Sequence, residues 1–250
     1  MKNYKISIVT PSYNQGKFLE DTILSVLNQD YKNIEYIIID GGSTDNSVDI
    51  IKKYSDQISY WVSESDGGQS DAINKGFKMA TGDYIGWLNS DDFYTEGAIL
   101  KLVENINSQA VLYYAIQGHC HEDGSHSRIE NIDENITFDS LLNGKSVTSQ
   151  PGSFYEKEAL EKIGFLDESL KFVMDTDLWL KLLQYGTPKF IPYVMAYLRA
   201  HNDSKSCNKK ISDIRESQQV FRKYGGNIFS LHYLRGKYAI YTNFFRKKYK

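Results

Sequence analysis

The sequence predicts an α/β fold in which helices cover a mostly parallel central sheet. Residues 6–10 and 34–40 are apolar without polar alternation, as expected for strands buried on both faces. Residues 18–28 lie between them and place apolar side chains at helical spacing. The chain therefore opens with a strand, a helix and a second strand. The alternation is expected to continue with a helix starting at 43–45, a strand at 58–63, a helix at 72–80 and a strand at 84–88.

The second half is expected to add helices, one strand and a polar loop to the same domain. We place helices at residues 97–105, 157–163 and 178–183, a strand at 111–116 and a loop at 118–127. With 250 residues, of which 41% are hydrophobic, the chain can bury one sizeable core. One large domain, or one domain with an appendage, is therefore expected.

The cysteines and the apolar segments bear on the cellular compartment. Cys120 and Cys207 are far apart and have no metal-ligand spacing, so neither a disulfide framework nor a zinc site is indicated. The chain starts without an apolar signal segment, and no apolar run approaches the length of about 18 residues that spans a membrane. We expect a cytoplasmic protein.

Charge is distributed unevenly along the chain. Residues 205–250 hold 12 Lys or Arg against two acids, a local charge of +10, which leaves −13 for residues 1–204 of a chain whose net charge is −3. This tail alternates bases with aromatic residues, a pattern that suits the surface of an anionic membrane, so we expect peripheral association with the inner membrane face. Helices packed on the domain, or pairing of two subunits into a homodimer, are open alternatives. Nucleic acid is not expected as a partner because the body is acidic and no base-reading motif is present.

Three loop motifs follow predicted strands: TPSYNQG at residues 10–16, DGGSTD at 40–45 and LNSDD at 88–92. A parallel sheet binds ligands at the carboxyl ends of its strands, so the three loops indicate one site and an enzyme. Taken alone, the second motif favours the simpler interpretation that Asp40 and Asp45 cap a strand end and a helix start. The adjacent Asp91 and Asp92 are best accommodated by a divalent cation, with a solvated turn as the alternative. Neither GxGxxG nor GxxxxGK[ST] is present, which weakens the dinucleotide and P-loop alternatives.

Taken together in this order, the motifs resemble the glycosyltransferase family 2 enzymes, over residues 5–205. The resemblance implies the GT-A nucleotide-diphospho-sugar transferase fold, with a nucleotide-sugar half at 1–95, an acceptor half at 96–205 and a basic helical extension at 206–250. It implies that the first loop lines the nucleotide pocket, through Thr10, Pro11, Tyr13 and Asn14. The second loop would recognise the base through Asp40 and Ser43, with Gly41 standing where the family usually has a second acid.

The resemblance also implies a divalent metal, Mn²⁺ or Mg²⁺. The family's Asp-x-Asp motif is matched by Asp91, with Asp92 beside it, whereas Asn89 stands at the first acidic position and is followed by Ser90. Asn89 adds no charge and is expected to weaken metal binding. The ending LRAHNDSKS resembles a family segment whose flexible loop closes over the diphosphate, so Arg199 and His201 are expected to contact phosphate or metal. His119, His121 and His126 are expected to be solvated instead.

The segment from Trp61 to Asp92 resembles a subgroup of bacterial surface-polysaccharide transferases, as found in capsule and lipopolysaccharide synthesis. The matching positions are Asp66, Gly67, Asp71, Asn74 and Lys75. Ile73 stands where most of the family has Arg, so diphosphate contacts would fall to Asp71 or Lys75. Placement of Asn74 and Lys75 on a helix surface is the alternative.

The expected general base is Asp175, which matches an acid that precedes a helix in the family, with Met174 in place of the preceding Glu. Simple capping of the helix by Asp175 is the alternative. Asp177 is expected on the acceptor side as a helix-start carboxylate. Gln150, Pro151 and Gly152 match the family's acceptor-side loop.

We therefore predict an inverting glycosyltransferase that uses a nucleotide-diphosphate sugar, with UDP favoured. The acceptor would be a hydroxyl of a saccharide or lipid-linked saccharide, reached at the inner membrane face. A catalytically weak sugar-nucleotide-binding scaffold is the alternative, because Gly41, Asn89 and Met174 replace family acids. A sugar-nucleotide pyrophosphorylase is disfavoured because TPSYNQGK lacks a glycine-rich loop with several bases.

Overall fold

The computed structural model describes residues 2–107, 109–202, 204, 211–228, 233–234 and 236–238. Within them, nine strands form one curled sheet in the order β3-β2-β1-β4-β8-β6-β9-β5, with β7 paired to β6. The strands are β1 (Ile6–Ser12), β2 (Ile34–Asp40), β3 (Tyr60–Ser63), β4 (Tyr84–Trp87), β5 (Phe93–Tyr94), β6 (Ala110–Cys120), β7 (His126–Ile129), β8 (Ser153–Glu156) and β9 (Thr187–Arg199). The α-helices are α1 (Leu19–Leu27), α2 (Ser47–Lys53), α3 (Gln69–Met79), α4 (Ala98–Asn105), α5 (Phe138–Leu142), α6 (Lys157–Ile163), α7 (Met174–Tyr185) and α8 (Ile211–Lys223), and a 3₁₀ turn, η1, spans Ser55–Gln57.

The first four strands form the parallel half of the sheet, as the sequence predicts. β1 pairs in parallel with β2 on one side and with β4 on the other, and β3 extends the sheet beyond β2. Every residue of β1 is buried, because helices cover both of its faces. The carboxyl ends of these strands consequently lie along one edge.

The second half of the sheet is mixed, so the expectation of a mostly parallel sheet holds only for β1 to β4. β8 is antiparallel to both β4 and β6, whereas β6 and β9 are parallel. The polar loop expected at residues 118–127 is largely a hairpin, since β6 extends to Cys120 and β7 begins at His126. Alternation of side chains indicates a strand, but it does not identify the neighbour or the direction of pairing.

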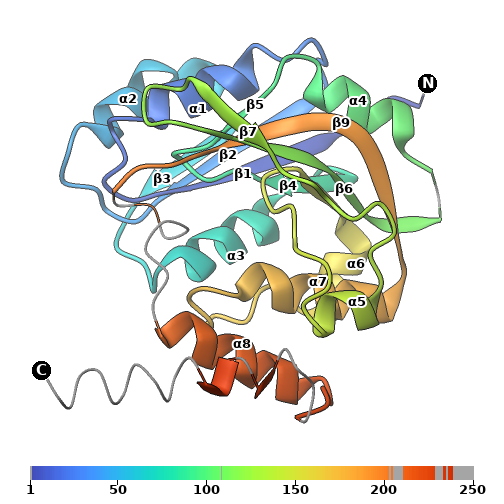
Figure 1. The fold of residues 1–250 in the computed structure, drawn as a ribbon. Coiled ribbons are helices and arrows are strands. Elements are labelled where there is room, and N and C mark those ends of the chain that lie inside the picture. Colours follow the sequence, from blue (N-terminus) through green and yellow to red (C-terminus); the bar gives the residue numbers. More distant parts are fainter. Residues whose placement is uncertain are drawn as a thin grey trace, which may run out of the picture.

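Helices form a layer on each face of the sheet (Figure 1). One hydrophobic core contains buried side chains of α1, α2 and α4, including Leu19, Ile51 and Leu102. The other contains buried side chains of α3 and α7, among them Phe77 and Trp179. The two cores fix the sheet between them, and the strand-end loops project from its edge.

The helix α8 lies against α7 at the outer side of the second layer (Figure 1). This part of the predicted 206–250 tail is therefore helical and packed on the domain. The rest of that segment lies outside the described residues, apart from residues 224–228, 233–234 and 236–238. No helix among the described residues is long and apolar enough to span a membrane.

Candidate active site

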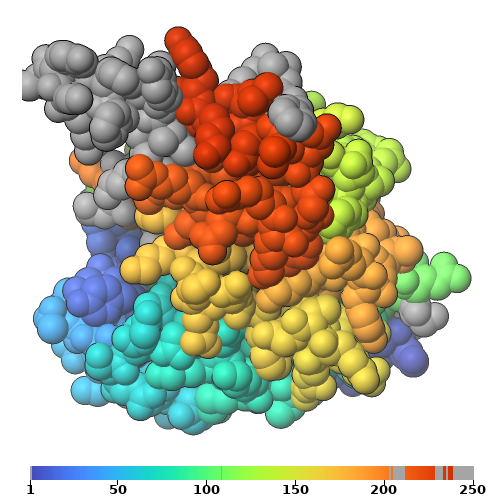
Figure 2. All heavy atoms as spheres, turned by 90° about the horizontal axis from the view of Figure 1, so that it is seen from below, coloured from blue at the N-terminus to red at the C-terminus, as the bar shows by residue number. Residues whose placement is uncertain are grey.

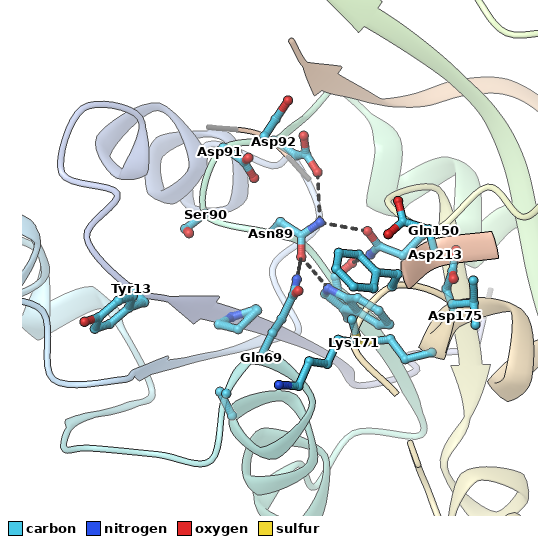
Figure 3. Close-up of a pocket in the computed structure, with 18 of the residues that line it drawn as sticks. Tyr13, Gln69, Asn89, Ser90, Asp91, Asp92, Gln150, Lys171, Asp175 and Asp213 are labelled. Atoms are coloured by element: carbon cyan, nitrogen blue, oxygen red, sulfur yellow. Dashed lines mark hydrogen bonds between the residues drawn. The ribbon is translucent and has the colours of Figure 1, made fainter. Parts of the chain in front are cut away.

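A cavity of about 1080 Å³ lies beside the ends of β1, β2 and β4, where the predicted loops meet (Figure 3). Residues 171–175 and the helix α8 close its other side. The predicted residues that line it are Pro11, Tyr13, Gly41, Asp66, Asn89, Ser90, Asp91, Asp92, Gln150, Asp175 and Arg199. The structure thus brings together residues from both halves of the chain.

The first two loops are tied to each other behind this lining. Asp40 is fully buried, and its carboxylate accepts hydrogen bonds from Ser43 N–H (2.9 Å), Ser43 Oγ–H (2.6 Å) and Ser63 Oγ–H (2.7 Å). Asn14 has a positive φ of 52°, and its Oδ1 accepts a bond from the Thr44 N–H at 2.8 Å. Thr10 is also buried and accepts a bond from Tyr36. These side chains shape the loops without lining the cavity.

Gly41 and Asp66 occupy neighbouring positions at the cavity wall. A Cβ atom built on Gly41 would lie 2.8 Å from Oδ2 of Asp66, closer than such atoms approach in proteins. The Asp66 carboxylate therefore fills the space that a side chain at position 41 would need. Position 41 lacks the family's second acid, but Asp66 in the β3–α3 loop places a carboxylate beside it.

The site residues that were predicted on α3 make their contacts within the protein. Asp71 accepts a bond from the Gly67 N–H (2.8 Å), and this bond, with Lys75 nearby, holds the pKa of Asp71 below its usual value. Lys75 pairs with Glu64 at 3.1 Å. Asn74 is 3% exposed and bonds to the backbone N–H and C=O of Leu166. The diphosphate roles suggested for Asp71 and Lys75 find no support here, because neither side chain lines the cavity.

Asn89 lies at the centre of a closed hydrogen-bond network (Figure 3). Its Oδ1 accepts bonds from Gln69 Nε2 (2.8 Å) and Trp87 Nε1 (2.7 Å). Its Nδ2 donates to Gln150 Oε1 (2.9 Å) and to Asp92 Oδ2 (3.2 Å). The Gln150 amide donates in turn to the Trp87 carbonyl (2.7 Å), which fixes the direction of every bond. The amide of Asn89 is thus needed as both donor and acceptor.

Asp91 faces the cavity, and His201 lies behind it as its partner. His201 Nε2 lies 3.0 Å from Asp91 Oδ2, and the exposed fractions of the two side chains are 4% and 19%. The imidazole packs against Phe18, with ring centroids 4.6 Å apart. His201 does not itself line the cavity, but it orients the carboxylate that does.

Asp92 lies at the cavity but is almost fully buried, and its predicted role as a metal ligand stays a prediction. Only 4% of the residue is exposed, and its Oδ1 accepts the backbone N–H of Arg199 at 3.0 Å. Burial, together with the neighbouring charge of Asp91, raises the pKa of Asp92 well above its usual value. We therefore assign Asp92 to fixing the loop against β9.

The guanidinium of Arg199 is also used within the protein, so its predicted phosphate contact is not supported. It donates to the carbonyl groups of Asp91 (3.1 Å) and Glu122 (2.9 Å) and pairs with Asp21 at 2.8 Å. The guanidinium also lies 5.0 Å from the ring of Phe18. This side chain joins β9, α1 and the loop after β4 into one frame.

Asp175 lies in the first turn of α7 and lines the cavity, on the same side as Gln150 and Asp213 (Figure 3). Its Oδ2 accepts a bond from the Thr148 hydroxyl (2.5 Å), and its Oδ1 accepts one from the Thr176 N–H (2.8 Å). Burial raises the pKa of Asp175, and these hydrogen bonds oppose the rise. The helix cap is Val173, so Asp175 is available for a role other than capping.

Three predicted acceptor-side residues lie outside the cavity lining. Asp177 is fully buried and accepts bonds from Lys223 (2.8 Å) and the Tyr224 hydroxyl (3.0 Å), so it anchors α8. Pro151 and Gly152 are buried in the turn before β8. They place Gln150 in the Asn89 network, which is their contribution to the site.

The histidines of the β6–β7 hairpin lie away from the cavity. His119 Nε2 is 2.5 Å from Glu130 Oε2, and His126 stacks on Tyr197 with centroids 3.9 Å apart. Among the described residues, no group of three or more His, Cys, Asp or Glu side chains is placed to hold a metal ion.

The sequence did not identify the contributions of Gln69, Lys171 and α8 to the cavity. Gln69 lies inside the recognised segment SDGGQSD, so its position there was an available signal. For α8, the sequence offered only an alternation of bases and aromatic residues, which does not indicate which part of the domain a helix covers.

Residues 7–164 match the family model described as glycosyl transferase family 2. The chain belongs to this family. It is 31% identical over 231 residues to an uncharacterized glycosyltransferase of Rickettsia typhi, a match that covers 86% of this chain and 70% of that protein. An uncharacterized glycosyltransferase of Mycobacterium tuberculosis is 29% identical over 96% of this chain and 94% of its own length. In a Rickettsia felis relative the match covers only 37% of the protein.

Solved structures similar to this glycosyltransferase share its GT-A fold. TarS of S. aureus in complex with UDP-GlcNAc has a TM-score of 0.69 at 16% identity, covering 91% of this chain and 73% of TarS residues in that structure. A mannosyltransferase of Pyrobaculum calidifontis in complex with GDP-Man and Mn²⁺ has a TM-score of 0.67 at 14% identity, covering 88% of this chain and 64% of that one. These likenesses establish the fold of the glycosyltransferase.

Proposed function

We propose that this glycosyltransferase transfers a sugar, with inversion, from a nucleotide-diphosphate sugar to a hydroxyl of a saccharide or lipid-linked saccharide. The observation that carries the proposal is one cavity lined by the strand-end loops, by Asp91 and, from the second half of the chain, by Asp175. UDP is the favoured nucleotide, and TarS, a neighbour in fold, is described in complex with UDP-GlcNAc. Synthesis of a bacterial surface polysaccharide is the proposed setting.

The donor set of Asp91 and His201 fits a divalent metal. The carboxylate Oδ2 and the imidazole Nε2 are 3.0 Å apart, and Mn²⁺ accepts both ligand types. Mg²⁺ commonly uses one or two protein carboxylates and takes its other ligands from water and phosphate. When bound, the metal would neutralise charge on the diphosphate leaving group. The described neighbour that contains Mn²⁺ and GDP-Man supports the same chemistry.

Asp175 is the proposed general base. Its raised pKa makes it a stronger proton acceptor than an ordinary carboxylate, while Thr148 holds its orientation. The carboxylate would accept the acceptor's hydroxyl proton as the oxygen attacks the anomeric carbon. The bond from that carbon to the diphosphate breaks on the opposite face, which inverts the configuration.

The experiment that tests the donor site is calorimetric titration with UDP, GDP and dTDP, in manganese and in EDTA. Binding of one nucleotide only when metal is present would support the proposal and identify the base. No binding of any nucleotide would contradict it.

A sugar-nucleotide-binding scaffold is the second candidate, favoured by the closed network around Asn89 where the family has an acid. A scaffold would bind the nucleotide in the same titration. It would not hydrolyse or transfer the sugar, so release of UDP from UDP-sugars distinguishes the two functions.

An acceptor at the inner membrane face belongs to the same proposal, because residues 239–250 carry four bases and no acid. A chain ending at residue 238 retains α8 and removes this segment. Weaker sedimentation of the shortened chain with anionic vesicles is expected, and equal sedimentation of the two chains would contradict a membrane role for residues 239–250.

A further inference from the structure

The helix α8 supplies one wall of the cavity. Asp213, Ile214, Ser217, Gln218 and Phe221 line it and recur every three or four residues, so they share one face of the helix. Figure 2 shows the orange-red α8 region lying against the yellow-to-gold segment that leads into α7. The α8 part of the predicted tail therefore contributes to the cavity.

Two carboxylates fix α8 in this position. The carboxylate of the fully buried Asp177 accepts hydrogen bonds from Lys223 and Tyr224 at one end of the helix. On the helix itself, Glu216 accepts the backbone N–H groups of Lys171 (3.1 Å) and Phe172 (2.8 Å). The Asp177 carboxylate is fully buried, and loss of its α8 partners would remove two of the groups that compensate its charge, so this contact resists separation of the helix from the domain.

The Glu216 contact also connects α8 to the proposed base. Lys171 and Phe172 directly precede α7, whose first turn carries Asp175. Displacement of α8 would release this short segment. The wall and the base are consequently held as one unit.

The size of the cavity leaves room for a second ligand. Pockets for one small ligand usually measure about 300–1000 Å³. This cavity measures about 1080 Å³ and extends from the strand-end loops to α8. A nucleotide sugar at the strand ends would leave the α8 side for another molecule.

The side chains of the α8 wall suit a saccharide. Ser217 and Asp213 line the cavity with a hydroxyl and a carboxylate, groups that can hydrogen-bond to sugar hydroxyls. Gln218 is only 7% exposed, and its amide donates to the Tyr233 carbonyl at 3.2 Å, so it holds the wall in place. Phe221 and Tyr233 stack on each other with ring centroids 5.5 Å apart and are 3% and 7% exposed, so they form the apolar base of this wall. Polar groups beside aromatic surface are typical of a ligand wall.

We propose that the α8 wall is the acceptor subsite and that Ser217 contacts the saccharide whose hydroxyl faces Asp175. This inference rests on the proposed glycosyl transfer, since it assigns the strand-end loops to the donor. It assigns acceptor choice to the C-terminal helix in place of Pro151, Gly152 and Asp177.

The test compares two substitutions on α8, Ser217→Trp and Gln219→Trp. Ser217 lines the cavity, whereas Gln219 is exposed on the helix and does not line it, so it is the matched control. UDP binding is measured by calorimetry for both variants and the parent protein. Sugar binding is measured by saturation-transfer NMR with methyl glycosides of glucose, galactose, mannose and N-acetylglucosamine, in the presence of UDP and magnesium.

The inference expects a sugar signal in the parent and in Gln219→Trp, loss of that signal in Ser217→Trp, and equal UDP affinity in all three. Equal sugar signals in both variants, or no signal in the parent, would overturn the saccharide subsite. Weaker UDP binding by Ser217→Trp alone would place the wall in the donor site and also overturn it. Failure of the parent to bind UDP with metal would instead be a failure of the proposed function.

Discussion

The two sides of the cavity are built in different ways. On the proposed donor side, short loops follow parallel strands and are held by bonds within a loop, as between Asp40 and Ser43, and between adjacent loops, as between Asn14 and Thr44. On the acceptor side, contacts join residues far apart in the chain, as between Asp177 and Lys223. Loops at one edge of a sheet can therefore form the proposed nucleotide site from short sequence motifs, whereas the facing wall forms only when separate helices pack together.

The largest expected effect is on the acceptor side, at Asp175. Replacement by Asn retains the size of the side chain but removes the proton acceptor, so turnover should fall about 10³-fold. Affinity for UDP should remain unchanged, because the donor loops are untouched. Steady-state kinetics and calorimetry check both expectations, with Asp49→Asn, on the exposed face of α2 and away from the cavity, as control. Unchanged turnover would remove Asp175 from the mechanism.

The next largest effect is expected on the donor side, at Asn89. Replacement by Asp removes two hydrogen-bond donors and places a carboxylate beside buried Asp92, at a cost of about 2–4 kcal/mol in the free energy of unfolding. Denaturant unfolding measures the loss. The double variant Asn89→Asp with Asp92→Asn restores an amide to the pair and should recover part of the stability. Equal stability of the single variant and the parent would show that the network does not depend on this amide.

A smaller effect is expected at Gly41. Replacement by Asp crowds the Asp66 carboxylate and adds a second charge beside it, so UDP affinity should fall about tenfold, or about 1.4 kcal/mol. Exchange of the two residues, Gly41→Asp with Asp66→Gly, should recover much of the affinity if either position can supply the acid. Titration with UDP in manganese decides this. Full affinity in the single variant would show that the space is not shared.

The smallest effect is expected at Thr148, as a shift in pH dependence. Its hydroxyl lowers the pKa of Asp175, so Thr148→Val should raise that pKa further. Because the base acts as a carboxylate, activity is lost as pH falls through its pKa, and the acidic limb of the rate profile should move to higher pH. The dependence of kcat on pH measures the shift. Coincident profiles for the variant and the parent would argue against proton transfer to Asp175.

The sequence predicted strands in both halves of the sheet, but the parallel direction it predicted is found only among β1 to β4. Residues 34–40 form β2 with the expected bounds, because an unbroken apolar run between turn signals permits few alternatives. Residues 118–127 were expected to be a polar loop, because the segment is rich in His, Asp and Gly, but they include the end of β6 and the start of β7, whose residues are all exposed. The pairing of β7 with β6 is set by backbone hydrogen bonds that the sequence does not display.

The sequence by itself determined the family, the α/β alternation of the first half and the loops that line the nucleotide side. Those features depend on short runs of residues whose geometry is local. Only the tertiary structure decided that Asp92 and Arg199 fix a loop, that Asp66 fills the space beside Gly41, and that α8 closes the cavity. Each of these depends on which distant groups satisfy a buried charge or hydrogen bond, and that is settled only when the chain is folded.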